Sequence, residues 1–296
     1  MGSRLIPFGW VGSKVGMLPY ILPLFPAHHV YVDVFGGSGA VLLNKQPAVI
    51  EVYNDLDEGL ITFFEVIRDP QTYQQFVEKA QWLLSSRTLW TRFRDTWQDQ
   101  PDPVEKALRW WYVASTSYAG RWGAGWAVVG PRTDKTKNHN LRLFRSRLKA
   151  VHERFRDVNV ENKDFRDLIP IYDSPKTFFY CDPPYDMQAR ASDNAVYRHE
   201  SDETLHEDLV KLLLDIEGMA MLSGYETPIY QPLLDAGWQI KRFTRRAASV
   251  GKTRALRAKR QGDFSDKRVE CVYISPRTVI EHDLFGPPLP QFTETD

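Results

Sequence analysis

Short apolar runs alternate with amphipathic stretches at both ends of the chain. The runs are rich in β-branched or aromatic residues, carry few charges and end in polar or glycine-containing turns; they cover 30–35, 48–53, 158–160, 177–181 and 219–223. Such runs are typical of strands that are buried on both faces of a parallel sheet. Two further runs, 239–243 and 269–274, predict closing strands. The pattern therefore predicts the α/β fold class.

Between the second and third of these runs the strand–helix alternation is lost. A helix capped by Asp57 is expected to continue to Arg68, with one apolar side. From there to about residue 140 the chain predicts helices rich in Trp and Arg, including one that Asp102 and Pro103 open. Asn140 is expected to cap an amphipathic helix whose inward positions are Leu141, Phe144, Leu148, Val151 and Phe155.

One stretch carries the most chemistry. Residues 177–185 read Thr-Phe-Phe-Tyr-Cys-Asp-Pro-Pro-Tyr, a buried strand that two prolines end abruptly. Asp182 is thereby held at the carboxyl edge of the sheet, where open α/β sheets bind their ligands. Asp182 and the Pro183 carbonyl can accept the two N–H bonds of an exocyclic amine while Tyr185 stacks on its ring. An ordinary loop after a buried strand is the alternative, since Pro-Pro pairs are common in turns.

A glycine-rich turn follows the first strand. Gly36, Gly37 and Gly39 let the backbone approach a ligand, and the following helix N-terminus favours negative charge. Asp55, after the second strand, is well placed to accept from ribose hydroxyls. This arrangement fits a nicotinamide dinucleotide or S-adenosylmethionine. Asp33 before the glycines and the missing last glycine of the dinucleotide motif favour S-adenosylmethionine.

Two other segments are candidate parts of the same site. The N-terminal loop carries Trp10 and Lys14, which either tie an arm to the domain or close over a carboxylate-bearing ligand. Asp164 and Phe165 follow the third predicted strand, where the pair can accept from an adenine amino group and pack beside its ring. The polar stretch 186–200 is too long for a tight turn and is a candidate substrate loop.

Basic residues gather in two segments although the net charge is zero. The stretch 241–260 contains nine Lys or Arg and no acid. The other segment surrounds the predicted helix after Asn140, and the glycine-hinged loop 118–126 precedes it with Arg121, Trp122 and Trp126. Both segments fit solvated surfaces, but contact with a phosphate backbone is the better interpretation. The helix segment adjoins a loop rich in Arg and Trp, and the stretch 241–260 is an uncompensated basic loop expected opposite the active edge. The basic residues around that helix are Arg132, Lys135, Lys137, Arg142, Arg145, Arg147, Lys149, Arg154 and Arg156.

Composition adds further bounds. The chain has two cysteines, Cys181 and Cys271, and both fall on predicted buried strands, so we expect core thiols without a disulfide or metal role. Nine Trp exceed the needs of a core of this size, which makes some of them candidates for stacking, although additional core aromatics are the default interpretation. No apolar run is long enough to span a bilayer, and a soluble cytosolic protein is expected.

Taken together, these motifs resemble the Dam-type (D12 class) DNA adenine N6-methyltransferases, particularly the compact phage and prophage forms. The resemblance rests on an ordered set of motifs: 8–14, 33–39, 54–55, 164–165, 182–185 and 223–225. It implies a Rossmann-like S-adenosylmethionine-dependent methyltransferase sheet, mostly parallel with one antiparallel strand near the edge. It also implies catalytic segments at 1–70 and 141–283, an inserted helical target-recognition domain at 71–140 and a flexible tail at 284–296. The basic segment 244–268 matches no family motif.

The resemblance also implies the reaction and the residues that carry it. The chain is expected to methylate N6 of a flipped adenine in double-stranded DNA with S-adenosylmethionine and no metal, as a monomer or weak dimer in the cytosol of a bacterium or phage-infected host. Cytosine N4 or RNA adenine as acceptor, and a nonenzymatic DNA-binding protein on this scaffold, stay open as alternatives; a nicotinamide-dependent oxidoreductase is more distant. The expected catalytic residues are Asp182, Pro183, Pro184 and Tyr185. The expected cofactor residues are Trp10, Lys14, Asp33, Phe35, Gly36, Gly37, Gly39, Asp55, Asp164, Phe165 and Asp182. The expected DNA contacts are Arg121, Trp122, Trp126, Arg132, Lys135, Lys137, Arg254, Arg257, Lys259 and Arg260.

Overall fold

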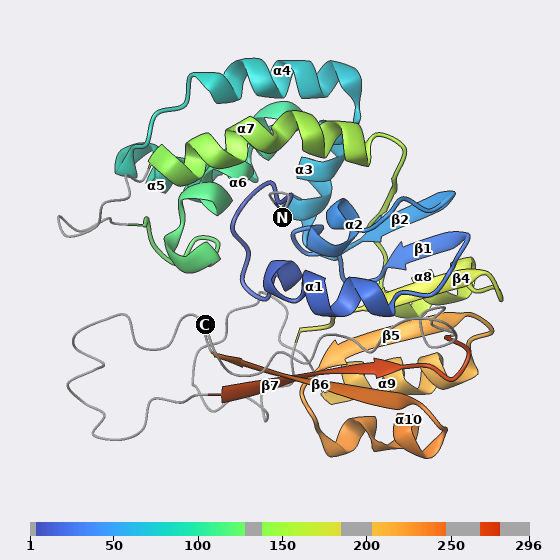
Figure 1. The fold of residues 1–296 in the computed structure, drawn as a ribbon. Coiled ribbons are helices and arrows are strands. Elements are labelled where there is room, and N and C mark those ends of the chain that lie inside the picture. Colours follow the sequence, from blue (N-terminus) through green and yellow to red (C-terminus); the bar gives the residue numbers. More distant parts are fainter. Residues whose placement is uncertain (1–3, 128–137, 185–202, 247–266, 279–296) are drawn as a thin grey trace, which may run out of the picture.

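The computed structural model describes residues 4–127, 138–184, 203–246 and 267–278 (Figure 1). A seven-stranded sheet with the order β3-β2-β1-β4-β5-β7-β6 forms its centre. The strands are β1 (Val30–Asp33), β2 (Ile50–Asn54), β3 (Asn159–Glu161), β4 (Thr177–Cys181), β5 (Met219–Gly224), β6 (Gln239–Arg246) and β7 (Lys267–Ile274). β1 to β5 pair in parallel, whereas β7 is antiparallel to both β5 and β6. The predicted fold class, with one antiparallel strand near the edge, is confirmed.

Alternation along the strands divides the core into two layers. In β4, Phe178 and Tyr180 face one cluster of buried side chains, whereas Phe179 and Cys181 face the other. Cys181 and Cys271 are buried free thiols, as expected of core positions. Helices from the middle of the chain cover the first face. The second face is covered by α8 (Phe165–Tyr172), α9 (Glu203–Asp215) and α10 (Gln231–Asp235). Figure 1 shows the first helical layer lying over the sheet.

The helices follow the predicted caps closely. They are α1 (Leu18–Ile21), α2 (Ala40–Asn44), α3 (Glu58–Arg68), α4 (Pro70–Gln81), α5 (Arg87–Thr96), α6 (Pro103–Thr116), α7 (Asn138–Phe155), α8 (Phe165–Tyr172), α9 (Glu203–Asp215) and α10 (Gln231–Asp235). Asp57 and Asp102 cap α3 and α6 with their side chains, as predicted. Asn140 was expected to cap this helix but lies inside it, because α7 begins at Asn138; the predicted inward positions of α7 are buried.

Helix α6 is the centre of the helical layer. Most residues from Val104 to Thr116 along it are buried, and it packs against α3, α4, α5 and α7. Its two indoles also contact the N-terminal segment: Trp111 Nε1 donates to Pro7 O over 2.9 Å, and the Trp110 ring lies edge-on to Phe8 at 5.0 Å. The helices between the two halves of the sheet are therefore packed onto the N-terminal loop.

The N-terminal segment continues from that loop in three short helical turns. They are the 3₁₀ turn η1 (Lys14–Gly16), α1 and the 3₁₀ turn η2 (Leu22–Leu24), which ends just before Pro26. Two further 3₁₀ turns are η3 (Tyr118–Gly120) and η5 (Pro228–Tyr230). Among the described residues, no helix combines the length and the apolar character that crossing a bilayer requires.

Candidate active site

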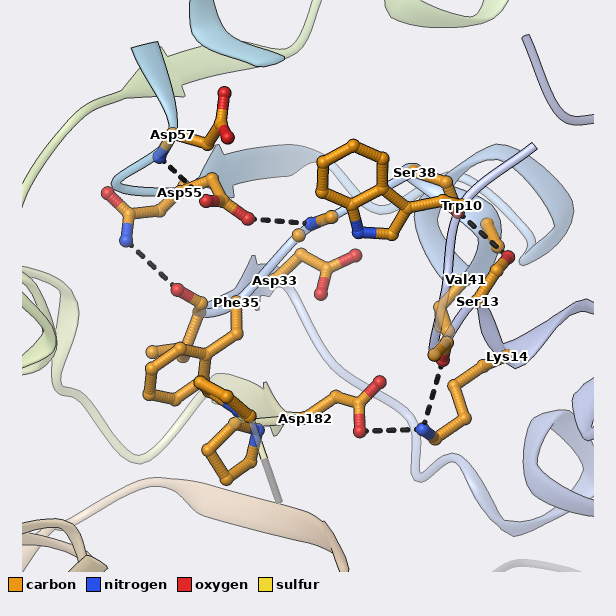
Figure 2. Close-up of a pocket in the computed structure, with 18 of the residues that line it drawn as sticks. Trp10, Ser13, Lys14, Asp33, Phe35, Ser38, Val41, Asp55, Asp57 and Asp182 are labelled. Atoms are coloured by element: carbon orange, nitrogen blue, oxygen red, sulfur yellow. Dashed lines mark hydrogen bonds and ion pairs between the residues drawn. The ribbon is translucent and has the colours of Figure 1, made fainter. Parts of the chain in front are cut away.

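Three acids meet at the carboxyl edge of the sheet. Asp33 ends β1, and the neighbouring strands β2 and β4 lead directly into Asp55 and Asp182. All three line one cleft of about 1140 Å³, counted out to the solvent at its mouth. Figure 2 shows their side chains around this space, opposite Trp10 and Lys14. The order of the strands changes direction at β1 and β4, which is where open α/β sheets bind ligands.

The glycine-rich turn forms one wall of this cleft. Gly37 and Gly39 adopt φ angles of +50° and +65°, which favour glycine over residues with a side chain. Gly36 leaves space for Tyr53, since a Cβ atom at position 36 would lie 2.2 Å from Tyr53 Cε2. The Tyr53 hydroxyl donates to Gly37 O over 2.6 Å. Gly36 and Gly37 line the cleft, whereas Gly39 shapes the turn and packs beside Phe64.

Asp55 joins the end of β2 to the glycine turn. Its Oδ2 accepts from Gly37 N over 2.8 Å, and its Oδ1 accepts from Asp57 N over 2.9 Å. Burial raises the pKa of Asp55 to about 6, because these hydrogen bonds offset only part of the desolvation. Asn54 beside it donates to Val34 O and Lys163 O, which ties the ends of β1, β2 and β3 together.

Asp33 is a buried acid that has unused hydrogen-bonding capacity. Its Oδ2 has no hydrogen-bond partner among the described residues, although the side chain is 2% exposed. Burial raises the pKa of Asp33 well above its ordinary value, and the charges of Asp182 and Asp55 raise it further. A buried, unsatisfied carboxyl is costly, so this geometry favours a cationic or hydrogen-bond-donating ligand in the cleft.

Asp182 is paired with a lysine from the N-terminal loop. Lys14 Nζ lies 2.7 Å from Asp182 Oδ1, and the two side chains are 6% and 16% exposed. Lys14 also donates to Gly12 O over 3.3 Å (Figure 2). Burial disfavours the ammonium, but the carboxylate of Asp182 outweighs it and raises the pKa of Lys14. Lys14 is therefore charged and holds one oxygen of Asp182.

The remaining predicted cofactor residues divide into those that line the cleft and those beside it. Trp10 and Phe35 line it, as do Pro183 and Pro184 after Asp182. The structure does not bring Asp164 or Phe165 into the lining. Asp164 caps α8 and pairs with Arg166, whereas the buried Phe165 packs against Phe35 at 5.7 Å.

The predicted DNA-reading loop is partly a packing element. Tyr118 N donates to Gly125 O, and Ala127 N donates to Thr116 O, so the two ends of the loop are joined. Trp122 is directed inward: its Nε1 donates to Trp110 O over 3.2 Å, and its ring lies 5.8 Å from that of Trp97. Arg121 is exposed, and Trp126 lies beneath the Arg87 guanidinium at 5.2 Å.

Two arginines of the predicted phosphate-binding helix serve internal contacts instead. Arg145 donates to Gln81 O and Leu83 O, and Arg154 pairs with the buried Glu51. Sequence could not distinguish them from exposed neighbours because every basic residue on α7 fits a solvated face. Several predicted residues lie outside the described part of the chain: Tyr185, Arg132, Lys135, Lys137, Arg254, Arg257, Lys259 and Arg260, together with the predicted substrate loop.

Some cleft residues were not predicted. Ser13 and Ser38 hydrogen-bond through their Oγ atoms over 2.8 Å, and Lys163 lines the cleft beside Asp55. The serines stand within the predicted N-terminal and glycine motifs, which was the available signal. No cluster of three His, Cys, Asp or Glu that could hold a metal occurs within the ranges that the structure describes.

The strand order and the acids at the edge of the sheet together define a Rossmann-like methyltransferase fold. More specifically, the chain belongs to the D12 class of N6 adenine-specific DNA methyltransferases, whose family profile matches residues 10–229. It is also similar to the modification methylase StsI of Streptococcus sanguinis, with 28% identity over 195 residues. That alignment covers 60% of this chain and 28% of the relative, so the chain spans well under half the length of this larger protein.

Proposed function

We propose that this protein transfers the methyl group of S-adenosylmethionine to N6 of an adenine flipped out of double-stranded DNA. The observation that carries the proposal is the position of Asp182, which opens onto the same cleft as Asp33 and Asp55. The carboxylate that would accept hydrogen bonds from the substrate amine therefore shares one cavity with the residues suited to a nucleoside cofactor. The family match supports adenine as the acceptor.

The residues around the cleft fit S-adenosylmethionine, which when bound supplies a methyl group on a positively charged sulfur. Asp33 offers its unpaired Oδ2 to the amino group of the methionine part. Asp55 remains able to accept from ribose hydroxyls, and Trp10 and Phe35 provide apolar walls for the rings. The excess of acids over bases in the lining favours a cationic ligand.

Asp182 and the Pro183 carbonyl act on the substrate amine. The nitrogen lone pair of an adenine amine is delocalised into the ring and is a poor nucleophile. Hydrogen bonds to these two acceptors favour a pyramidal nitrogen with its lone pair directed at the methyl carbon, so the rate arises from positioning and electrostatics. Stacking on Tyr185 stays a prediction; it would return roughly 1–3 kcal/mol of the few kcal/mol that base flipping costs.

We propose that residues 71–140 form the target-recognition domain and that 1–70 and 141–283 form the catalytic domain. Residues 284–296 are assigned as a tail. Arg121 is the best-placed described residue for DNA contact, because it is exposed on a loop whose ends are fixed. We propose that the basic residues of 132–137 and 254–260 also contact DNA. We further infer that the protein works in a bacterial or phage-infected cytosol as a monomer or weak dimer.

Mass spectrometry of nucleosides tests the proposal directly. DNA lacking adenine methylation, incubated with the protein and S-adenosylmethionine, should yield N6-methyladenine. Asp182→Ala should abolish the product while the Kd for S-adenosylhomocysteine, measured by calorimetry, changes only a few-fold. If the product is N4-methylcytosine, the methyl acceptor is cytosine; if only RNA is methylated, the acceptor is an RNA base. DNA binding without any methyl transfer would support a nonenzymatic role instead.

A further inference from the structure

Glu270 is an acid on β7 that the proposed reaction leaves without a role. Its partner across the antiparallel pair with β6 is Phe243, so the two side chains project from the same face of the sheet. The Phe243 ring lies 5.5 Å from that of Tyr20 in α1. Glu270 therefore lies on the face that η1 and α1 cover, which is the face on which Lys14 meets Asp182.

The alternation of β7 supports this placement. Val272 and Ile274, two and four residues further along, belong to the core layer beneath α1, whereas Cys271 and Tyr273 belong to the opposite layer. Glu270 comes just beyond the residue that pairs with Gly224, the last residue of β5. It is therefore at the carboxyl edge of β5, on the Lys14 side of the sheet.

Glu270 also has an acceptor to spare. Its Oε2 is buried and has no hydrogen-bond partner among the described residues. A buried carboxylate oxygen without a donor costs free energy, which a cation moving to it would recover. The negative charge of Glu270 also favours the charged form of Lys14. Burial lowers the pKa of Lys14, whereas the charges of Asp182 and Glu270 raise it.

The ion pair poses a problem for the chemistry proposed above. As methyl transfer proceeds, positive charge develops on the substrate nitrogen, and Asp182 must stabilise it. A lysine ammonium 2.7 Å from Asp182 opposes that charge and occupies Oδ1. For Asp182 to serve the amine fully, Lys14 needs another anionic partner within reach.

We propose that Glu270 is a positioning residue that takes over the Lys14 ammonium when the substrate amine reaches Asp182. The inference rests on the proposed methyl transfer. No covalent step is involved: Lys14 exchanges one carboxylate for another and stays protonated. Asp182 Oδ1 is then free to accept from the amine. The competing partner for Lys14 is the carboxylate of the methyl donor itself.

The experiment compares Glu270→Gln with the wild type under saturating S-adenosylmethionine. We expect kcat for tritium transfer to DNA to fall about tenfold or more, with the Kd for S-adenosylhomocysteine within twofold and the Tm unchanged. Glu226→Gln is the matched control, because Glu226 is an exposed acid near the same sheet edge that pairs with Arg242. It should keep the wild-type kcat.

A double-mutant cycle identifies the route of the effect. In a Lys14→Met background, Glu270→Gln should change kcat less than twofold, because its partner is gone. If Lys14→Met is too slow to assay, the kcat, the Kd for S-adenosylhomocysteine and the Tm of Glu270→Gln alone test the proposal. An unchanged kcat, or a loss of Tm or cofactor affinity parallel to kcat, overturns the proposal and leaves the donor's carboxylate as the partner of Lys14. A wild type that methylates no nucleic acid refutes the proposed function itself.

Discussion

Gly120 packs its Cα directly against the backbone of Trp10. A Cβ atom at position 120 would lie 2.9 Å from Trp10 N and 3.1 Å from the carbonyl carbon of Gly9. Trp10 lines the cleft, and Gly120 precedes the exposed Arg121 in the loop proposed to meet DNA. One backbone contact therefore joins the recognition loop to the wall of the proposed cofactor site.

Gly120→Ala should weaken cofactor binding. Gly120 has a φ angle of +72°, and its neighbours in the contact are backbone atoms that cannot rotate away. Relief of the clash requires the N-terminal loop to move, which displaces Trp10. An overpacking cost of roughly 1–3 kcal/mol corresponds to a loss of about tenfold in affinity for S-adenosylhomocysteine, measurable by calorimetry.

Gly123→Ala is the control for backbone strain in the same loop. Gly123 has a φ angle of +70°, but the nearest atom to an added Cβ is Arg94 Cδ at 3.7 Å. This variant should share the strain of Gly120→Ala and keep the wild-type cofactor affinity. Equal losses in both variants would show that loop strain, and not the contact with Trp10, controls the site.

The pKa of Asp55 should make stability depend on pH. Because burial raises it from 3.8 to about 6 in the folded state, the native protein binds this proton more tightly than the unfolded chain. The resulting stabilisation is fully present below the unfolded pKa and is lost as the pH rises through 6. Asp55→Asn removes this pH-dependent stabilisation, so relative to the wild type the variant should be more stable at pH 8 than at pH 5, by roughly 1–2 kcal/mol. The amide also turns an N–H donor toward Gly37 N or Asp57 N, and that lost hydrogen bond lowers the stability equally at both pH values.

Thermal unfolding at the two pH values measures this difference. The same variant should bind S-adenosylhomocysteine more weakly, since the amide is a poorer acceptor for ribose hydroxyls than the carboxylate. A variant that is equally stable relative to the wild type at pH 5 and pH 8 would contradict the raised pKa. Retained affinity would argue against the ribose role.

Many helix ends, strand ends and site residues of this protein could be predicted from residues that are neighbours in the sequence. The caps at Asp57 and Asp102 and the break after Cys181 depend on nearby residues, so a pattern of residues is enough to find them. The position of the acids at neighbouring strand ends followed from the parallel sheet that the apolar runs predicted.

The missed features depend on contacts between distant segments. Lys14 was expected to meet a ligand, and it does line the cleft; the sequence did not show that it also pairs with Asp182, 168 positions away in the chain. Asp164 follows a strand, as predicted, but its side chain caps the next helix and turns from the cleft. Packing decides whether the side chain at the end of a strand points into the cleft, and residue type alone does not predict this.

A buried charge cluster should hold α7 to the sheet. Glu51 accepts from Lys45 Nζ over 2.5 Å and from Arg154 Nη2 over 2.8 Å, and the three side chains are 15% exposed or less. Glu51→Gln leaves two buried cations without a compensating charge. We expect the free energy of unfolding to fall by roughly 3 kcal/mol, measured by urea denaturation.

Glu153→Gln is the matched change on the surface. Glu153 also lies on α7, but it is 61% exposed and lies 3.8 Å from Lys149. Solvent screens such pairs, so the unfolding free energy should change by less than about 0.5 kcal/mol. Similar losses in the two variants would mean that the cluster at Glu51 contributes no more than an ordinary surface pair.

Arg121 and Trp122 are adjacent in the chain but should have separate effects. Arg121→Ala removes an exposed cation, so DNA affinity should fall and the slope of log Kd against log salt should flatten by about one unit; the Tm should stay unchanged. Trp122→Ala removes an indole that packs against Trp97 and donates to Trp110 O. It should cost roughly 3 kcal/mol of stability.

Fluorescence anisotropy on labelled duplex DNA at several salt concentrations, with thermal unfolding of the same samples, measures the DNA affinity and the stability of both variants. If Trp122→Ala keeps the wild-type Tm and loses DNA affinity as Arg121→Ala does, the indole reads DNA as first predicted from the sequence. The packing assignment made from the structure would then be wrong.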